Sequence, residues 1–322
     1  MFLVQRKMKT KAFFDVFIVG IAAIMSVVLI FSLKSAHAAT VKQKQFGSPE
    51  EAVKALITAI KANDAKELQA IFGPAGKSLI FSGDEVADQM GREQFTKAYE
   101  EMNQLEKKDE NRVILHVGSA DWPFPVPIVK QGNSWHFNAS EGKEEILNRR
   151  IGKNELNAIQ VCLAVVDAEM EYAAEDRGGD GIRKYAQKFV SDLGQKNGLY
   201  WDTKEGEDPS PLGPLAARAS REGYAGRHGT GKSAPYYGYF YRILKEQGKN
   251  ASGGTRSYLV KGKMIGGFAL VAYPAEYGNS GIMTFIVNQD GVVYQKDLGR
   301  STAKIAGAMK AFDPDPAWHK AN

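Results

Sequence analysis

The stretch "FGSPEEAVKALITAIKAND", residues 46–64, carries the punctuation of a helix at both ends. Ser48 is a preferred N-cap type, Pro49 suits the first helical position, and Glu51 follows the cap by three residues. Asn63-Asp64 then interrupts the pattern, so a helix is predicted over residues 49–62. Apolar residues at helical spacing give it one buried stripe: Val53, Leu56, Ile57 and Ile60.

Further along the chain, helices give way to strands. A short second helix is predicted with Leu68, Ile71 and Phe72 on its buried side, and a third helical region over residues 92–105. The hydrophobic period then changes to that of strands. Three segments are rich in β-forming residues, and Gln131-Gly132-Asn133 joins the last two as a hairpin: "RVILHVG" (112–118), "PVPIVKQ" (125–131) and "SWHFNA" (134–139).

A second unit follows the charged stretch "SEGKEEILNRRIGKNE", residues 140–155. It opens with a long helix predicted over residues 154–174 and continues through a proline- and glycine-rich crossing to residue 233. Strands are then predicted at 236–244, 256–275 and 281–297. Helices segregated from antiparallel strands predict an α+β fold, with one domain at 46–150 and a second at 151–318.

Residues 1–38 have the features of an export leader. Ala36-His37-Ala38 is the small-x-small pattern of signal peptidase cleavage before Ala39. The apolar run 16–33 is also close to the roughly 18 residues that cross a membrane, so an uncleaved inner-membrane anchor facing the periplasm is the alternative. We expect a periplasmic or secreted protein that touches the membrane only if this segment is retained. Four basic residues precede the run: Arg6, Lys7, Lys9 and Lys11.

Charge and cysteine content exclude several classes of function. The 322-residue chain has a formal charge of +5, but residues 1–38 hold five of its 42 basic and one of its 37 acidic residues, which leaves +1. This balance predicts no nucleic-acid partner. The single cysteine, Cys162, lies in the apolar helical pattern "LNAIQVCLAVVDAEMEY" and is interpreted as a packed thiol. The histidines show no metal-ligand spacing, so no metal or other cofactor is expected.

The segment "GRHGTGKS" matches the pattern of a phosphate-binding loop, with Gly226, Gly231, Lys232 and Ser233 in the pattern positions. That chemistry requires a buried strand before the loop and a helix after it. The preceding "PLAARASREGYA" has no run of β-branched residues, and the following "PYYGYFYRIL" reads as a strand. We therefore interpret this segment as a glycine-rich loop and expect no nucleotide cofactor.

Two other groups of residues carry candidate chemistry. "DRGGDG" places Asp176 and Asp180 at positions one and five of a calcium loop, but positions three and twelve lack ligands, so a turn at a helix end is favoured. His116 and His136 lie in predicted strands, with Asp121 nearby. If both imidazoles point inward, they would form an acid/base pair in a pocket of the first domain.

Several phrases of the sequence resemble a secreted bacterial family, domain-of-unknown-function family 2950: "GLYW", "SPLGPL", "PYYGYFYRIL", "MIGGFALVAYPAEYGNSGIMTFIVNQDGVVYQKDLG" and "FDPDPAW". The opening "FGSPEEAVKALITAIKANDAKELQAIFGPAG" resembles the nuclear-transport-factor-like (SnoaL-like) superfamily, in which a curved sheet wraps around a helix and leaves a pocket. The second unit distantly resembles the head domain of type IV pilin-like proteins. Its helix is internal and no prepilin site precedes it, so polymerisation into a pilus is not expected.

These observations predict an exported cell-envelope protein that binds or scaffolds and does not catalyse. An envelope protein or a small ligand would be its partner. The alternative is a pocket enzyme, of hydrolase or isomerase type, that uses His116 and His136.

Overall fold

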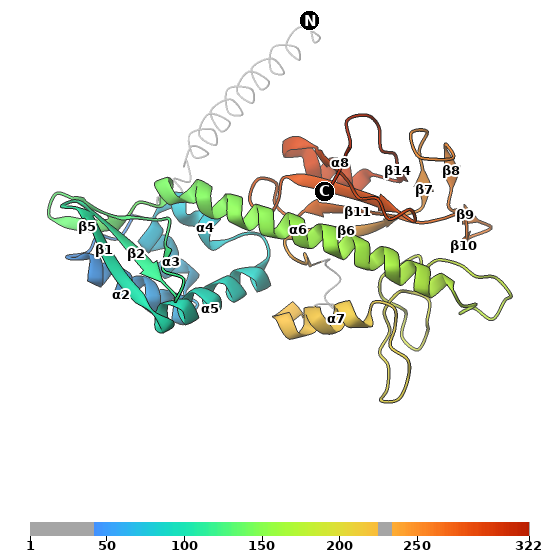
Figure 1. The fold of residues 1–322 in the computed structure, drawn as a ribbon, viewed down its shortest axis with the longest axis horizontal. Coiled ribbons are helices and arrows are strands. Elements are labelled where there is room, and N and C mark those ends of the chain that lie inside the picture. The colour runs from blue at the N-terminus through green and yellow to red at the C-terminus, as the bar shows by residue number, and fades with distance from the viewer. Residues whose placement is uncertain (1–41, 225–233, 322) are drawn as a thin grey trace, which may run out of the picture. The chain divides into compact units, whose positions relative to one another are not determined.

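The computed structural model describes residues 42–224 and 234–321, which form an α+β structure (Figure 1). The predicted leader and the loop Gly226–Ser233 lie outside these residues. No helix in the described ranges is both long enough and apolar enough to cross a membrane.

The first half begins with helices, as the sequence predicts. The Ser48 hydroxyl accepts a hydrogen bond from the Glu51 amide at 3.2 Å, and Asp64 caps the next helix through the Glu67 amide at 2.9 Å. Both caps satisfy amides that a helix start leaves free. The helical elements are α2 (Pro49–Lys61), α3 (Ala65–Phe72), the 3₁₀ turn η1 (Pro74–Gly76), α4 (Lys77–Ile80) and α5 (Glu85–Glu101).

An antiparallel sheet follows, with strand order β1-β2-β4-β5 and β3 paired to β2. The predicted hairpin is confirmed, because Gln131 pairs with Ser134. Alternate residues of β2 are buried and join Ile128 and Phe137 in a core with α2 and α3. The strands are β1 (Asn103–Asp109), β2 (Arg112–Val117), β3 (Trp122–Pro123), β4 (Ile128–Gln131) and β5 (Ser134–Phe137).

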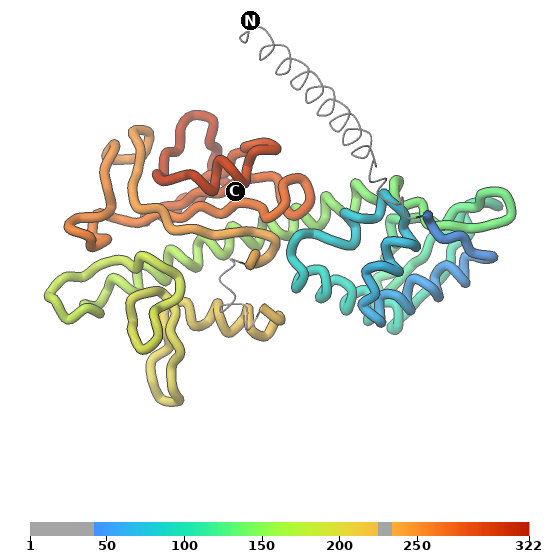
Figure 2. The backbone as a smooth tube through the Cα atoms, turned by 180° about the vertical axis from the view of Figure 1, so that it is seen from behind, coloured from blue at the N-terminus to red at the C-terminus, as the bar shows by residue number. Residues whose placement is uncertain are grey.

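Helix α6 (Ala139–Ala173) connects the two halves (Figures 1 and 2). Its first part contacts η1 and α4, and its later part packs on β11 (Ala269–Pro274) and β12 (Met283–Asn288) of a second sheet. The buried residues form two hydrophobic clusters, one in each half. Because α6 runs through residue 150, the domain boundary stays a prediction.

The second sheet has the order β15-β13-β12-β11-β6 and is antiparallel throughout. Residues 269–272 of its strand β11 are all buried, so both faces of that strand are covered. Figure 1 shows α6 on one side of the sheet and α8 on the other. The remaining elements of the sheet and its cover are β6 (Tyr239–Leu244), β13 (Tyr294–Asp297), β15 (His319–Lys320), η4 (Gly299–Ser301) and α8 (Thr302–Ala308).

Shorter elements complete the second half. Strand β7 pairs in parallel with β14 and in antiparallel orientation with β8. Strands β9 and β10 form a separate antiparallel pair. The long predicted strands are therefore shorter and more broken than expected, because turns divide residues 256–275. The elements are α7 (Gly213–Ala219), η2 (Ser220–Tyr224), β7 (Glu246–Gln247), β8 (Arg256–Ser257), β9 (Leu259–Val260), β10 (Lys263–Met264) and β14 (Ala311–Phe312).

Two predicted helices have the wrong limits. The region predicted at 92–105 is α5, which begins at Glu85 because Asp84 caps it, and β1 has started by Asn103 because it pairs with β2. The helix predicted from residue 154 begins at Ala139. Its charged first part is helical because one side packs on α4 and the other is solvated, with the ion pair Glu145–Arg149 at i, i+4 spacing.

Arg150 of α6 holds three segments together. Its guanidinium donates to the carbonyls of Ser78 and Leu79 at 2.7 and 2.9 Å, and to Oδ1 of Asn279 at 2.7 Å. Asn279 in turn donates to the Phe81 carbonyl at 2.7 Å. Desolvation lowers the pKa of Arg150, and the nearby carboxylates of Asp88 and Glu276 oppose this shift.

We expect Arg150→Ala to lower the free energy of unfolding by about 3 kcal/mol, because it leaves several acceptors without a donor. The neighbouring Arg149 is a matched control. Its ion pair with Glu145 is exposed, so Arg149→Ala should cost less than about 1 kcal/mol. Urea denaturation of both variants measures the difference, and equal small losses would contradict this role of Arg150.

A second prediction concerns Glu169, a fully buried residue of α6. Its Oε2 accepts from the Ala186 amide at 2.8 Å, while its Oε1 has no partner in the described part of the chain. Desolvation raises its pKa to about 8. The folded protein therefore retains a proton that the unfolded chain releases near pH 4.5, and stability should fall as pH rises from about 4.5 to 8.

Glu169→Gln removes this titration. Relative to the variant, the wild-type protein should lose up to roughly 4 kcal/mol over that pH range. Denaturation midpoints at pH 5 and pH 8 measure the loss, with Glu171→Gln on the exposed side of the same helix as control. If the stability of the wild type and of Glu169→Gln depended on pH in the same way, this prediction would be wrong.

Candidate functional site

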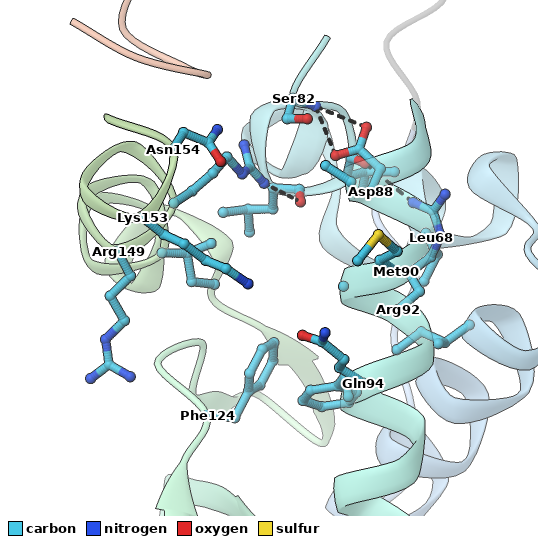
Figure 3. A pocket seen from close by; sticks show the side chains of 18 of the residues that line it. Leu68, Ser82, Asp88, Met90, Arg92, Gln94, Phe124, Arg149, Lys153 and Asn154 are labelled. Atoms are coloured by element: carbon cyan, nitrogen blue, oxygen red, sulfur yellow. Dashed lines mark hydrogen bonds between the residues drawn. The ribbon is translucent and has the colours of Figure 1, made fainter. Parts of the chain in front are cut away.

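A pocket of about 460 Å³ lies among α2, α3, α5 and α6 (Figure 3). Tyr224 and Tyr237 of the second half also line it. This volume falls within the range of about 300–1,000 Å³ typical of small-molecule sites. The pocket thus draws on both halves of the sequence, and α6 contributes one of its walls.

Most of the pocket wall is apolar. The rings of Phe95 and Phe124 lie 5.2 Å apart, and Trp122 contacts Phe124 edge-on at 6.1 Å. An aliphatic or aromatic ligand group would therefore find dispersion contacts on several sides. The apolar lining comprises Leu56, Ile60, Leu68, Phe72, Leu79, Ile80, Ala87, Met90, Phe95, Trp122, Phe124 and Ile146.

Charged groups occupy only part of the wall, and most of them are engaged with the protein. Asp88 is the one carboxylate of the lining, and it accepts from the Ser82 amide at 3.0 Å. Desolvation raises its pKa, although that hydrogen bond and the nearby Arg150 and Arg92 oppose the shift. Arg92 donates to the Ile80 carbonyl at 3.4 Å. These groups serve the protein's own structure.

The cationic side chains of α6 differ in how they are used. Arg150 is committed to backbone and amide oxygens, and Arg149 pairs with Glu145 at 2.7 Å while lying 5.4 Å from the Trp122 ring centroid. Lys153 has no hydrogen-bond or ion-pair partner within residues 42–224 and 234–321. Figure 3 shows its side chain reaching from α6 toward α5, into the space that Gln94 of α5 also borders.

The wall formed by Tyr224 and Tyr237 is fixed by Asp84, the cap of α5. Asp84 Oδ1 accepts from the Ala87 amide at 3.1 Å, and its Oδ2 accepts from the Tyr224 hydroxyl and the Gly238 amide, both at 2.9 Å. Burial and the nearby Asp84 raise the pKa of Tyr224, so its hydroxyl remains a donor.

Tyr237 is held in an unusual backbone conformation beside this cap. Its φ of 51° lies in the left-handed region, which bulky residues seldom adopt. The side-chain hydroxyl donates to the Glu222 carboxylate at 2.6–2.7 Å, and Arg218 pairs with the same carboxylate at 3.1 Å. These contacts offset the strain and fix the ring at the pocket wall.

The two histidines of the enzymatic alternative lie elsewhere. On β2, buried Leu115 faces the core, so His116 points to the other face of the sheet. Residues that pair directly across neighbouring antiparallel strands point to the same face of the sheet. His136 pairs with Val129 and Val129 pairs with Arg112, so His136 lies on the same outer face as His116. Strand geometry places the two histidines roughly 16 Å apart.

Neither histidine lines the pocket. His116 is instead held between Glu106 Oε2 at 2.9 Å and Asp121 Oδ1 at 3.1 Å. Desolvation lowers the pKa of His136. The structure therefore brings His116 and Asp121 together but does not bring the two imidazoles together.

The remaining candidates have structural partners. Asp180 pairs with Lys184 at 3.0 Å and Lys263 at 2.9 Å, which lower its pKa to about 2, and Asp176 accepts from the Gly178 and Gly181 amides. In the described residues, no group of three or more acidic, histidine or cysteine side chains could hold a metal ion. Cys162 is fully buried, which raises its pKa to about 12.

Sequence reasoning missed Asp84 and Lys153, the two most informative polar residues at the pocket. A signal existed for Asp84, because "SGDE" is an N-cap pattern. Lys153 lies in the stretch interpreted as a charged connection, and no local pattern distinguishes it from its basic neighbours. The phosphate-loop residues Gly226, Gly231, Lys232 and Ser233 lie outside the described residues.

A protein-family model described as "Protein of unknown function (DUF2950)" matches residues 43–321 of the chain. No curated protein and no solved structure matches it.

The contact between Asp84 and Tyr224 can be tested by removing one oxygen. We expect Tyr224→Phe to lower the free energy of unfolding by about 2 kcal/mol, because a buried hydrogen bond to a carboxylate is lost. Tyr200→Phe is the matched control, since its hydroxyl donates to the Asp202 carboxylate at 2.8 Å in an exposed place and should matter little. Chemical denaturation distinguishes the two variants, and identical stabilities would show that the Asp84 contact contributes nothing.

Proposed function

The chain belongs to the DUF2950 family of proteins of unknown function, and we propose that it is a non-catalytic binding protein of the cell envelope whose pocket holds a small, largely apolar ligand. The observation that carries this proposal is the pocket of about 460 Å³, which is lined mainly by aliphatic and aromatic side chains. Sites for small molecules commonly have such walls, with a few polar groups that fix the ligand's orientation.

The arrangement of the first half supports a relationship to the nuclear-transport-factor-like cone fold. Helices precede an antiparallel sheet that packs on α2 and α3, and a pocket remains among the helices. For the second half we propose the pilin-like plan of a helix on an antiparallel sheet, which α6 on β11 and β12 supports. Fold alone supplies no activity, so the argument for binding rests on the pocket.

Export is the second part of the proposal. It is supported by the basic start, the apolar run and the small-x-small pattern within residues 1–38. Delivery to the periplasm, or release from the cell, would place the pocket where envelope lipids and their precursors are available. If the leader is retained as an anchor, the pocket would face the same compartment.

Binding is favoured over the enzymatic alternative. The hydrolase or isomerase hypothesis depended on His116 and His136 facing each other within a pocket. Both lie on the outer face of the first sheet, and neither is among the residues that line the pocket. The side chains that do line the pocket are mainly apolar or engaged with backbone groups, which is the composition of a binding site.

Gly91 of α5 offers a direct test, because it lines the pocket and an added Cβ meets nothing within 4 Å. We expect Gly91→Phe to fill the space and weaken binding of N-phenyl-1-naphthylamine, a neutral apolar fluorophore, by at least about 10-fold. Fluorescence titration of the purified protein measures this change. Replacing a helical glycine should leave the fold intact or slightly more stable.

The matched control is Gly307→Phe on α8, an exposed position outside the pocket where an added Cβ also meets nothing. This variant should bind the fluorophore as the wild type does. Absence of binding to the wild type, or unchanged binding to a folded Gly91→Phe variant, would refute the proposed function.

A further inference from the structure

The pocket has an uneven distribution of charge that the apolar walls do not explain. Its lining includes four cationic side chains, Arg92, Arg149, Arg150 and Lys153, against the single carboxylate of Asp88. Three of the cations have a protein acceptor or carboxylate partner, and Asp88 accepts from a backbone amide. Lys153 is the cation of this set for which the described chain offers no such partner.

From this distribution, and resting on the proposed function, we propose that the ligand is a single-chain anionic amphiphile whose head group pairs with Lys153. Its apolar chain would lie along Phe95, Phe124 and the aliphatic residues behind them. The Gln94 amide, on the opposite wall, would supply a further donor to the head group (Figure 3).

The position of Lys153 fits a head-group site. Lys153 is exposed and lies one helical turn after Arg149, which forms an ion pair with Glu145. Its long stem lets the ammonium group reach the pocket opening while the carbons contact apolar wall. A head group placed there stays partly hydrated while the chain is buried, so the site separates the two parts of an amphiphile.

The same charges disfavour other head groups. A cationic head would meet Lys153 and Arg149 with only the engaged carboxylates of Asp88 and Glu145 nearby. A neutral head would leave the ammonium of Lys153 without an ionic partner. An anion alone gains from the local field, and the gain should weaken as salt rises because the site is partly exposed.

The test uses displacement of N-phenyl-1-naphthylamine at pH 7.5 by four molecules with the same chain: dodecanoate, dodecyl phosphate, dodecanol and dodecyltrimethylammonium. We expect the tighter anion to displace the fluorophore at a concentration about 10-fold lower than dodecanol, and the cation to be weakest. The ratio between the two anions identifies whether the head group is a carboxylate or a phosphate. Affinity for the anion should fall at higher salt.

Lys153→Ala should weaken the preferred anion about 5- to 10-fold and change dodecanol less than 2-fold, whereas Lys153→Arg should retain the preference. Lys143→Ala is the matched control, since Lys143 lies on the same helix outside the pocket lining. It should behave as the wild type.

The outcomes separate this inference from the proposed function. If the fluorophore and dodecanol bind but all four head groups bind equally, or if Lys153→Ala weakens dodecanol as much as the anions, the head-group assignment is overturned and the pocket remains a binding site. If neither the fluorophore nor any of the four chains binds, both proposals are overturned.

Discussion

The guanidinium of Arg150 is the contact on which the relation between the two halves depends. It donates to two carbonyls at the end of α4 and to Asn279 from the loop between β11 and β12, segments about 70 and 130 residues away in sequence. Because α6 packs on both cores, this one helix sets the spacing between them. A charged group that is removed from water, as the Arg150 guanidinium is, is stable only when its donors have acceptors. Other placements of α6 would leave these donors without partners and are therefore disfavoured.

The pocket follows from that arrangement. Helix α6 presents Arg149, Arg150 and Lys153 within about one turn, yet the three side chains meet different surroundings. Arg150 enters the junction between the halves, and Arg149 lies over Trp122 with Glu145 beside it. Lys153 extends into the pocket opening (Figure 3). These three chemically similar residues thus acquire different roles, structural or binding, only because of where they lie in the fold. Nothing in the neighbouring sequence distinguishes the three roles.

The opposite end of the pocket is fixed by a second contact between the halves. Asp84 both caps α5 and accepts from Tyr224 and Gly238, so the start of a pocket helix and the tyrosine wall are held by one carboxylate. The left-handed backbone at Tyr237 is a local cost that its bond to Glu222 offsets. A wall built this way is preorganised, which reduces the entropy lost when a ligand binds.

The sequence alone determined the features that depend on neighbouring residues. Ser48 and Pro49 mark the start of α2, Gln131-Gly132-Asn133 marks a hairpin, and the change of hydrophobic period marks the α+β class. The phrases of the second half also identified the family, which the match over residues 43–321 confirmed. Only the tertiary structure decided that α6 begins at Ala139, that His116 faces away from the core, and that Lys153 opens onto a pocket. These facts depend on strand register and on packing between residues far apart in the chain, and such contacts leave no local periodicity to read.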